Sequence, residues 1–259
     1  ASSLEEQALL PIITFEEMRG LHYAEDEILD EVVSRLQNIA EYQALFSEAF
    51  DEPSADREDS AINSENIGKA LAAFQRTLIA TDSAYDRYTA GDTNAMTSQQ
   101  VDGMHAFESV GCAECHSGPM FSDFQVHVLG VPDNTKLPES DQGLNQSYAF
   151  RTPSLRNLEF TAPYMHSGVF ANLQQVLRFY NGGRRGGQRN PAVGRNDRDI
   201  LFRRLDDVND HDREIIAFLG ALNDDSFDKA IPNRVPSGLP VGGLIDETAM
   251  ASSSSAILR

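Results

Sequence analysis

Apolar residues recur with the 3.6-residue period of an α-helix along several stretches of the chain. In the clearest case Ile28, Val32 and Leu36 fall on one helix face. The same kind of pattern predicts helices over residues 26–37, 41–50, 64–79, 97–111, 173–180 and 208–222. Residues 117–160 contain short apolar pieces between Gly and Pro and follow neither a helical nor a strand period. The chain is therefore predicted to be mainly α, with long loops.

Polar residues at the edges of these stretches predict where the helices begin and end. Ser64 and Asn172 are expected N-caps, and Thr97 with Gln100 has the spacing of a capping box. The pair Gly182-Gly183 is expected to end the helix that starts after Asn172. The helix that starts at Ser64 is predicted to bury Ile67, Leu71, Phe74 and Leu78.

The remaining segments are rich in polar residues, Gly and Pro. Residues 51–60 are predicted to be a solvated loop, 82–93 a polar turn region and 182–198 a Gly/Arg/Asn-rich loop. The tail from Asp224 has no period and is expected to be extended or frayed.

Charge excludes some classes of function. Among 259 residues, 21 Lys and Arg stand against 40 Asp and Glu, a formal net charge of −19. This balance argues against nucleic-acid binding, which needs basic surfaces. Acidity at this level fits either cationic partners or an acid-rich, salt-adapted proteome. No run reaches the ~18 apolar residues of a membrane span, and the first residues lack the pattern of a signal peptide, so a mature, trimmed or cytosolic chain is expected.

The two cysteines carry the strongest chemical signal. Cys112, Cys115 and His116 form C-x-x-C-H, the attachment signature of c-type haem. The two thiols add to the haem vinyl groups, and the next residue is directed at the iron as proximal ligand. A zinc site would need a second C-x-x-C or a His pair at ligand spacing, and a thioredoxin-like site would need a βαβ frame. Neither is visible, so covalent haem is predicted.

The sixth iron ligand is less determined by spacing. Met165 follows His116 by 49 residues, the usual order in a small cytochrome c, whereas Met120 is too close to His116 to reach the opposite haem face. The other side chains able to coordinate iron are His127, His166 and Tyr180. Spacing alone leaves this choice open, because a lone Met or Tyr is more often a packing residue.

Several motifs in order resemble the bacterial di-haem cytochrome c peroxidase/MauG family. They are Gly-Cys-Ala-Glu-Cys-His-Ser-Gly-Pro-Met-Phe at 111–121, Phe-Arg-Thr-Pro-Ser-Leu-Arg-Asn at 150–157 and Thr-Ala-Pro-Tyr-Met-His-Ser-Gly at 161–168, with weaker matches near the start and at 69–78. The resemblance runs from residue 1 to about residue 222.

This resemblance implies a specific architecture. Family members hold two c-type haems in two cytochrome c-like domains, and the single C-x-x-C-H here matches the second. The first haem is then expected upstream or on a separate polypeptide. Residues 1–95 would be the remainder of the N-terminal, peroxidatic haem domain with inter-domain helices, 96–223 the C-terminal cytochrome c-like haem domain and 224–259 an extended tail.

The resemblance also assigns a distal ligand. Tyr180 occupies the position of the second haem's distal ligand, where ordinary peroxidases of the family have Met and the MauG-like branch has Tyr. Tyr180 is therefore preferred over Met165. A phenolate lowers the reduction potential and favours storage of oxidising equivalents. The alternative is that Tyr180 packs beside the haem with its hydroxyl bonded to a neighbour.

Further site residues are implied in the same way. Those matching the distal pocket of the peroxidatic haem are Gln7, Pro11 and Glu17, the carboxylate moving a proton of bound H₂O₂. The carbonyls of Thr161 and Pro163 match a Ca²⁺ site. Without the resemblance, Glu17 reads as a solvated charge. Two arginines, Arg151 and Arg156, are candidates to pair with haem propionates or with some of the chain's carboxylates.

The expected function is a periplasmic c-type haem peroxidase that uses H₂O₂ to oxidise a partner: a cytochrome, a cupredoxin or a protein substrate that is modified. The periplasm is expected because covalent haem attachment occurs outside the bacterial cytoplasm. One alternative is a mono-haem electron-transfer protein without peroxidase activity, as one C-x-x-C-H would literally encode. Another is a non-catalytic haem sensor.

Overall fold

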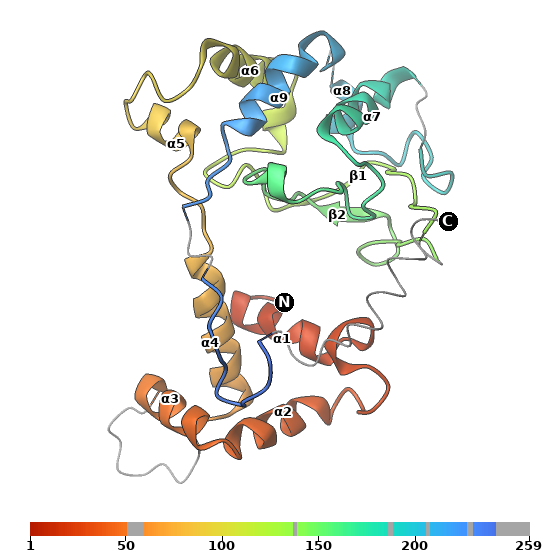
Figure 1. Cartoon of the computed structure of the whole chain (residues 1–259). Coiled ribbons are helices and arrows are strands. Elements are labelled where there is room, and N and C mark those ends of the chain that lie inside the picture. Colours follow the sequence, from red (N-terminus) through yellow and green to blue (C-terminus); the bar gives the residue numbers. More distant parts are fainter. Residues whose placement is uncertain (51–59, 137–138, 186–188, 206–207, 227–229, 242–259) are drawn as a thin grey trace, which may run out of the picture. The chain divides into compact units, whose positions relative to one another are not determined.

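The chain is mainly helical and divides into two compact units in this computed structural model (Figure 1). The structure describes residues 1–50, 60–136, 139–185, 189–205, 208–226 and 230–241. Unit 1 is formed by Ala1–Ile79 with Asp228–Arg259, and unit 2 by Ala80–Phe227. The predicted division into two haem domains, with a boundary between residues 95 and 96, stays a prediction.

Unit 1 holds the first helices, coloured red to light orange in Figure 1. Its elements are α1 (Leu4–Ile13), the π-helical turn η1 (Phe15–Arg19), α2 (Ile28–Gln37), α3 (Ala40–Phe50) and α4 (Ser64–Thr77). Unit 2 contains α5 (Ala84–Thr89), α6 (Ser98–Ser109), η2 (Cys112–Glu114), β1 (Val126–Val128), β2 (Ala149–Arg151), η3 (Leu158–Phe160), α7 (Leu173–Arg185), α8 (Ile200–Arg204), η4 (Val208–His211) and α9 (Asp212–Gly220).

Small residues, rather than large ones, form the packed face of α4. A β-carbon on Gly68 would lie 2.9 Å from the Glu5 carbonyl oxygen of α1, so the two helices approach closely at this glycine. Ile67 and Ala72 are buried on the same helix. The prediction that Leu71, Phe74 and Leu78 are buried with Ile67 is wrong, because they are 37%, 62% and 39% exposed. The close approach of α1 selects the face with the smallest side chains.

Three predicted boundaries shift. The N-cap of α4 is Asn63, whose side chain accepts from the Asn66 amide, and not Ser64. Residues 82–93 were expected to form a turn, but α5 forms there because Ser83 and Asp86 make a capping box. The helix capped by Asn172 continues past Gly182 to Arg185 instead of ending at the glycine pair.

A cluster of aromatic rings forms the core of unit 2. Phe107 of α6, Phe218 of α9 and Phe121 of the following loop lie with ring centroids 5.3–6.4 Å apart, and Tyr85 of α5 packs edge-on against two of them. A β-carbon on Gly103 would lie 1.8 Å from the Glu214 carbonyl oxygen, so α6 and α9 pack backbone to backbone. This core supports the turn that carries the cysteines.

The loops of unit 2 contain two short strands and a helix that periodicity did not reveal. Strands β1 and β2 pair antiparallel with His127 opposite Phe150. They are too short for a two-residue period to be recognised. Helix α8 lies between the predicted loop 182–198 and the predicted last helix, where no element was expected. The predicted last helix, 208–222, is split into η4 and α9.

Only part of the predicted tail is described, because residues 227–229 and 242–259 lie outside the described residues. Residues 51–59 of the predicted loop 51–60 also lie outside them. Within unit 1, Arg234 of the tail forms a two-pronged ion pair with Glu41 of α3 at 2.8 and 2.9 Å.

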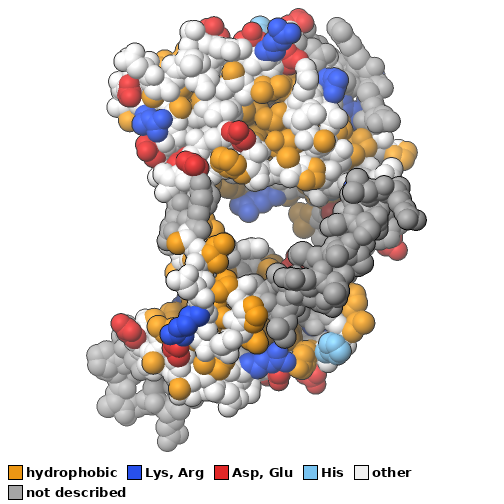
Figure 2. All heavy atoms as spheres, viewed as in Figure 1, with side chains coloured by type: hydrophobic (Ala, Val, Ile, Leu, Met, Phe, Trp, Pro, Cys, Tyr) orange, Lys and Arg blue, Asp and Glu red, His pale blue; other side chains and the backbone are white. Residues whose placement is uncertain are grey.

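Figure 2 shows acidic side chains at several separate places on the visible face. Among the described helices, none is long and apolar enough to cross a membrane.

Candidate haem site

The C-x-x-C-H segment begins where α6 ends. The predicted capping box of Thr97 and Gln100 is present at the start of α6. At its other end Gly111 adopts φ 94°, a left-handed conformation that favours glycine. Cys112–Glu114 then forms a 3₁₀ turn, and the His116 amide donates to the Cys112 carbonyl at 3.0 Å. The two thiols and the imidazole are thus fixed on one tight turn.

The surroundings of the two thiols favour their protonated form. Burial raises the pKa of Cys112 to about 12, and burial with nearby carboxylates raises the pKa of Cys115 to about 11. Reactive dithiols of redox enzymes need the opposite shift, toward the thiolate. The environment therefore disfavours a redox dithiol, and both cysteines are free in the structure.

The imidazole of His116 is oriented by the backbone. Its Nδ1 lies 3.0 Å from the carbonyl oxygen of Phe121. A carbonyl can only accept, so Nδ1 carries the proton and Nε2 is the ring nitrogen left with a lone pair for a metal. Burial lowers the pKa of His116, which favours the neutral ligand form. The Pro153 backbone also acts on this ring and, like Phe121, raises its pKa, but the effect of burial is larger. Phe121 has φ 50°, and its buried ring in the aromatic core holds this unusual conformation.

A histidine between two carboxylates lies next to Cys115. His127 Nδ1 is 2.7 Å from Asp199 Oδ2, and its Nε2 is 2.9 Å from Asp123 Oδ2. Burial alone would lower the pKa of His127, but these two hydrogen bonds outweigh it and the pKa is raised. Both ring nitrogens therefore donate as an imidazolium.

This arrangement bears on an alternative metal site. Ligand atoms of Cys115, Asp123 and His127 lie within 4.8 Å of one another, a grouping that sequence reasoning missed. An imidazolium has no lone pair for a cation, so the carboxylates, not a metal, satisfy His127. No sequence signal pointed to Asp199, which lies 72 residues from His127.

Both candidate distal ligands enter one apolar cluster. Tyr180 of α7 and Met165 pack, with others, against the buried residues Val131, Phe179 and Phe202. Burial, followed by the charges that the Cys112 and Cys115 thiols would carry, raises the pKa of Tyr180, so the hydroxyl lies within electrostatic range of both thiols. No hydrogen bond to another described residue contributes to this shift.

The other coordinating side chains are less suitable. His127 is engaged by carboxylates as described, and His166 is an exposed residue whose ring stacks on Phe150 at 3.5 Å between centroids. Met120 is half-buried five residues after Cys115. Within the described residues, Tyr180 and Met165 thus remain the candidates that share a buried cluster.

The residues expected around the first haem lie in unit 1. Gln7 and Pro11 are one turn apart on α1, so they share a helix face, and Glu17 is exposed on η1. Thr161 and Pro163 lie in an exposed loop of unit 2, next to η3. Their proposed roles are neither supported nor opposed by these positions.

The arginines expected to face propionates are placed differently. Arg156 donates to both carboxylate oxygens of Asp86 at 2.7 and 2.8 Å, so it is occupied by a protein partner. Arg151 is exposed, with its guanidinium over the Phe124 ring. In contrast, buried nitrogens of Arg189, Arg198 and Arg203 have no hydrogen-bond partner among the described residues. Such orphaned donors fit a cofactor that brings its own carboxylates.

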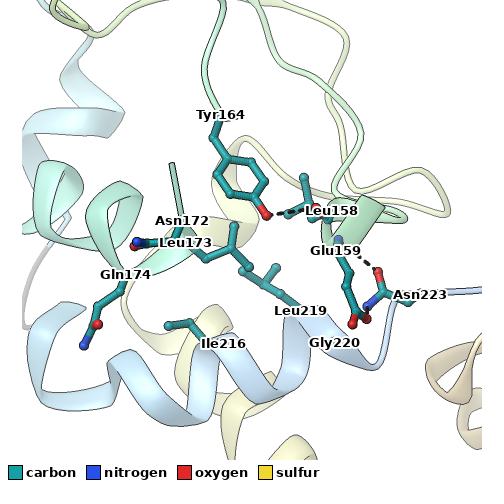
Figure 3. A pocket seen from close by; sticks show the side chains of 10 residues that line it. All are labelled: Leu158, Glu159, Tyr164, Asn172, Leu173, Gln174, Ile216, Leu219, Gly220 and Asn223. Carbon is teal, nitrogen blue, oxygen red and sulfur yellow. Dashed lines mark hydrogen bonds between the residues drawn. The ribbon is translucent and has the colours of Figure 1, made fainter. Parts of the chain in front are cut away.

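Figure 3 shows a pocket of about 390 Å³ in another part of unit 2. Its lining residues are Leu158, Glu159, Tyr164, Asn172, Leu173, Gln174, Ile216, Leu219, Gly220 and Asn223. Two polar groups that close it bind protein atoms: the Tyr164 hydroxyl donates to the Leu158 carbonyl, and the Asn223 amide to Glu159. The cysteines, His116 and Tyr180 do not line this pocket.

Comparison with known proteins gives an independent result. A family model described as di-haem cytochrome c peroxidase matches residues 1–94. A methylamine utilization protein MauG of Methylophilus methylotrophus is 34% identical over 86% of this chain and 62% of its own length. A cytochrome c551 peroxidase of Nitrosomonas europaea is 32% identical over 92% of this chain and 64% of its own length.

A solved structure agrees with these relatives. The crystal structure of a MauG-like protein associated with microbial copper homeostasis has a TM-score of 0.68 and 28% identity, covering 86% of this chain and 69% of that one. The chain spans less than two thirds of the length of the two curated relatives named above.

Proposed function

Since the chain belongs to the di-haem cytochrome c peroxidase and MauG family, we propose that it is the portion of a hydrogen-peroxide-dependent oxidoreductase that binds one c-type haem through Cys112, Cys115 and His116. The observation that carries this proposal is the hydrogen bond from His116 Nδ1 to the Phe121 carbonyl, which leaves Nε2 as the ligand atom. When bound, the haem supplies one-electron chemistry between a peroxide-derived oxidant and a partner.

The chain's own residues prepare this site. The turn after α6 holds both thiols on one short segment, and their raised pKa values disfavour disulfide exchange. The Phe121 carbonyl fixes the tautomer and plane of the His116 ring and makes Nε2 a better donor to iron. The apolar cluster around Phe179 and Phe202 holds both candidate distal ligands, Tyr180 and Met165.

Tyr180 is the proposed distal ligand, and Met165 is the alternative. Its hydroxyl would lose a proton on binding iron, a step that burial opposes and the positive charge of Arg189 favours. A phenolate donor stabilises the oxidised iron and lowers its potential. A haem of that kind suits retention of oxidising equivalents, which favours oxidation of a protein side chain over detoxification by an ordinary cytochrome.

The remaining roles follow from the family. Glu17, with Gln7 and Pro11, would line the distal pocket of a second, peroxidatic haem carried by an upstream portion or a separate chain. There the Glu17 carboxylate takes a proton from H₂O₂ and returns it to the leaving oxygen. Carbonyls of Thr161 and Pro163 would bind Ca²⁺. Covalent haem attachment places such a protein in the periplasm, with a cytochrome, a cupredoxin or a modified protein as electron donor.

Haem content and the response to peroxide test this proposal. The chain is expressed with a cytochrome c maturation system, and haem per chain is determined from the pyridine haemochrome and the intact mass. We expect one covalent haem on this chain, and a second in material that includes the upstream portion. Stoichiometric H₂O₂ should then produce a long-lived change in the ferric spectrum of the two-haem material.

The alternative gives a different result. A Met-to-iron charge-transfer band, one haem in all purified material and no reaction with H₂O₂ would identify a mono-haem electron carrier with His116 and Met165 as ligands. An open or exchangeable sixth position without peroxide turnover would instead indicate a sensor. Either result overturns the proposed peroxidase.

A further inference from the structure

Arg189 is a half-buried arginine with two buried donors that are unused among the described residues. Its Cζ lies 3.9 Å from the ring centroid of Phe179 and 4.7 Å from that of Phe202. One nitrogen, Nη2, donates to the Phe179 carbonyl at 2.7 Å. Its Nε and Nη1 are buried and have no hydrogen-bond partner in the described part of the chain. An unpaired buried donor destabilises the fold, and more so when it is charged, so a missing acceptor is indicated.

A second arginine with the same deficit lies near it. Burial, and then the like charge of Arg198, lowers the pKa of Arg189 to about 10. Arg198 also has a buried Nε with no partner among the described residues. This Nε lies 3.4 Å from the position of a β-carbon on Gly130, the residue before the buried Val131 of the apolar cluster. Two like charges thus face one region.

Carboxylates from the adjoining segments are engaged elsewhere. Asp133 accepts from Ser140 and Asn190, Asp197 from the Gly194 amide, and Asp199 from His127 and the Leu201 amide. In the ranges that the structure describes, no ion pair joins a carboxylate to Arg189 or Arg198. The acidic group that acts on Arg189 is the Tyr180 phenol, which its own burial keeps protonated.

We propose that Arg189 and Arg198 form the binding site for the carboxylates of the haem, with the Nε and Nη1 groups of Arg189 and the Nε of Arg198 each donating to a propionate oxygen. This inference rests on the proposed haem site. It replaces Arg156, whose guanidinium binds Asp86, and the exposed Arg151.

Chemistry and position favour this ligand. The free Nε–H and Nη1–H groups of Arg189 lie on different edges of the guanidinium, so each can donate a charge-assisted hydrogen bond to a separate carboxylate oxygen. The guanidinium lies against the rings of Phe179 and Phe202, in a cluster that also contains Tyr180 and Met165, the two candidate distal ligands. A haem ligated from this cluster brings two carboxylates to a region that holds two underused arginines.

The test compares variants of the full chain with haem attached. Arg189→Gln removes the charge and the guanidinium donors of Arg189, whereas Arg189→Lys keeps the charge. Arg198→Gln tests the second arginine. Arg195→Gln, an exposed arginine of the same loop, is the matched control. Readouts are the resonance Raman propionate-bending bands, the reduction potential across pH, and haem per chain.

We expect shifted propionate bands and a lower reduction potential in Arg189→Gln, because loss of a nearby positive charge disfavours reduction of the iron. Its potential should also become pH-dependent near neutrality, as a propionate without its counter-charge titrates there. Arg189→Lys should keep most of the potential but shift the bands. Arg195→Gln should match the parent chain.

Two outcomes overturn the inference. One is unchanged bands and potential in both Arg189→Gln and Arg198→Gln at full haem content. The other is an effect of Arg189→Gln that vanishes in a Tyr180→Phe background, which would assign the donors to the phenolate. Absence of covalent haem in the parent chain would instead contradict the proposed function, so the two failures are distinguishable. Arg198→Gln with Arg189→Lys keeps the test valid if Arg189→Gln does not fold.

Discussion

Asp86 and Arg156, seventy residues apart, form a two-pronged ion pair with N–O distances of 2.7 and 2.8 Å inside unit 2. The same carboxylate accepts from the backbone and hydroxyl of Ser83 at the start of α5. The Arg156 side chain is 8% exposed and also donates to the Pro119 carbonyl. The pair therefore joins α5 to two loops that follow the Cys112–His116 turn in the sequence, one at Pro119 and one at Arg156.

Removing Arg156 should destabilise unit 2. Arg156→Gln leaves a partly buried carboxylate without its counter-charge, and we expect a loss of about 2–4 kcal/mol in the free energy of unfolding. Arg151→Gln, at an exposed site, should cost under about 1 kcal/mol. Urea denaturation of both variants checks this, and equal losses would contradict the importance of the pair.

The same pair predicts acid sensitivity. The hydrogen bond from Arg156 lowers the pKa of Asp86 from 3.8 to about 2. A depressed carboxyl pKa stabilises the fold above the unfolded value, and this stability is lost as the pH falls through the folded value. Between pH 3.8 and 2, the parent chain should therefore lose about 2 kcal/mol more than Asp86→Asn, which lacks this titration.

His127 predicts a loss of stability on the alkaline side. Burial opposes its charge, but Asp199 and Asp123 raise its pKa above 6.5 in the fold. A raised histidine pKa stabilises the fold fully below the unfolded value, and the contribution is lost as the pH rises through the folded value. Melting temperatures of the parent chain should fall over this range, whereas those of His127→Gln should be lower and flatter. A parallel pH profile for the two proteins would refute the imidazolium.

The variants Tyr180→Phe and Met165→Leu should behave differently, because only one of the two residues is the distal ligand of the haem. Both substitutions preserve apolar packing in the same cluster. Only Tyr180→Phe should change the ferric spectrum and raise the reduction potential of the haem, because it removes the phenolate donor. The opposite pattern, with a response confined to Met165→Leu, would assign the ligand to the thioether.

Alanine substitutions at two glycines test the packing of α6 on α9, with one of them as the control. Gly103→Ala places a β-carbon 1.8 Å from the Glu214 carbonyl oxygen, so the helices must separate, at a cost of about 3 kcal/mol. Gly220→Ala meets nothing within 4 Å and should be neutral or stabilising by up to about 1 kcal/mol. Thermal unfolding of both variants measures the difference, and a Gly103→Ala protein as stable as the parent would contradict this packing.

Local chemistry was readable from the sequence wherever neighbouring residues decide it. The capping box of Thr97 and Gln100, the cap at Asn172 and the helices around 28–37 and 40–50 depend on spacing within one or two turns. The C-x-x-C-H motif is local as well, and its motif neighbours carried the family resemblance. Long-range choices failed: α4 turns Gly68 and Ala72 inward rather than Leu71 and Phe74, because α1 approaches that face.

The sequence by itself thus determined the helical class and the family, and it predicts the residues that attach haem, since each depends on short-range pattern. Only the tertiary structure decided which arginine is free, because Asp86 takes Arg156 while Arg189 keeps two unused donors among the described residues. It also brought Asp123 and Asp199 to the two nitrogens of His127. Which charged groups pair depends on their distances in space. The spacing of residues along the chain does not determine these distances.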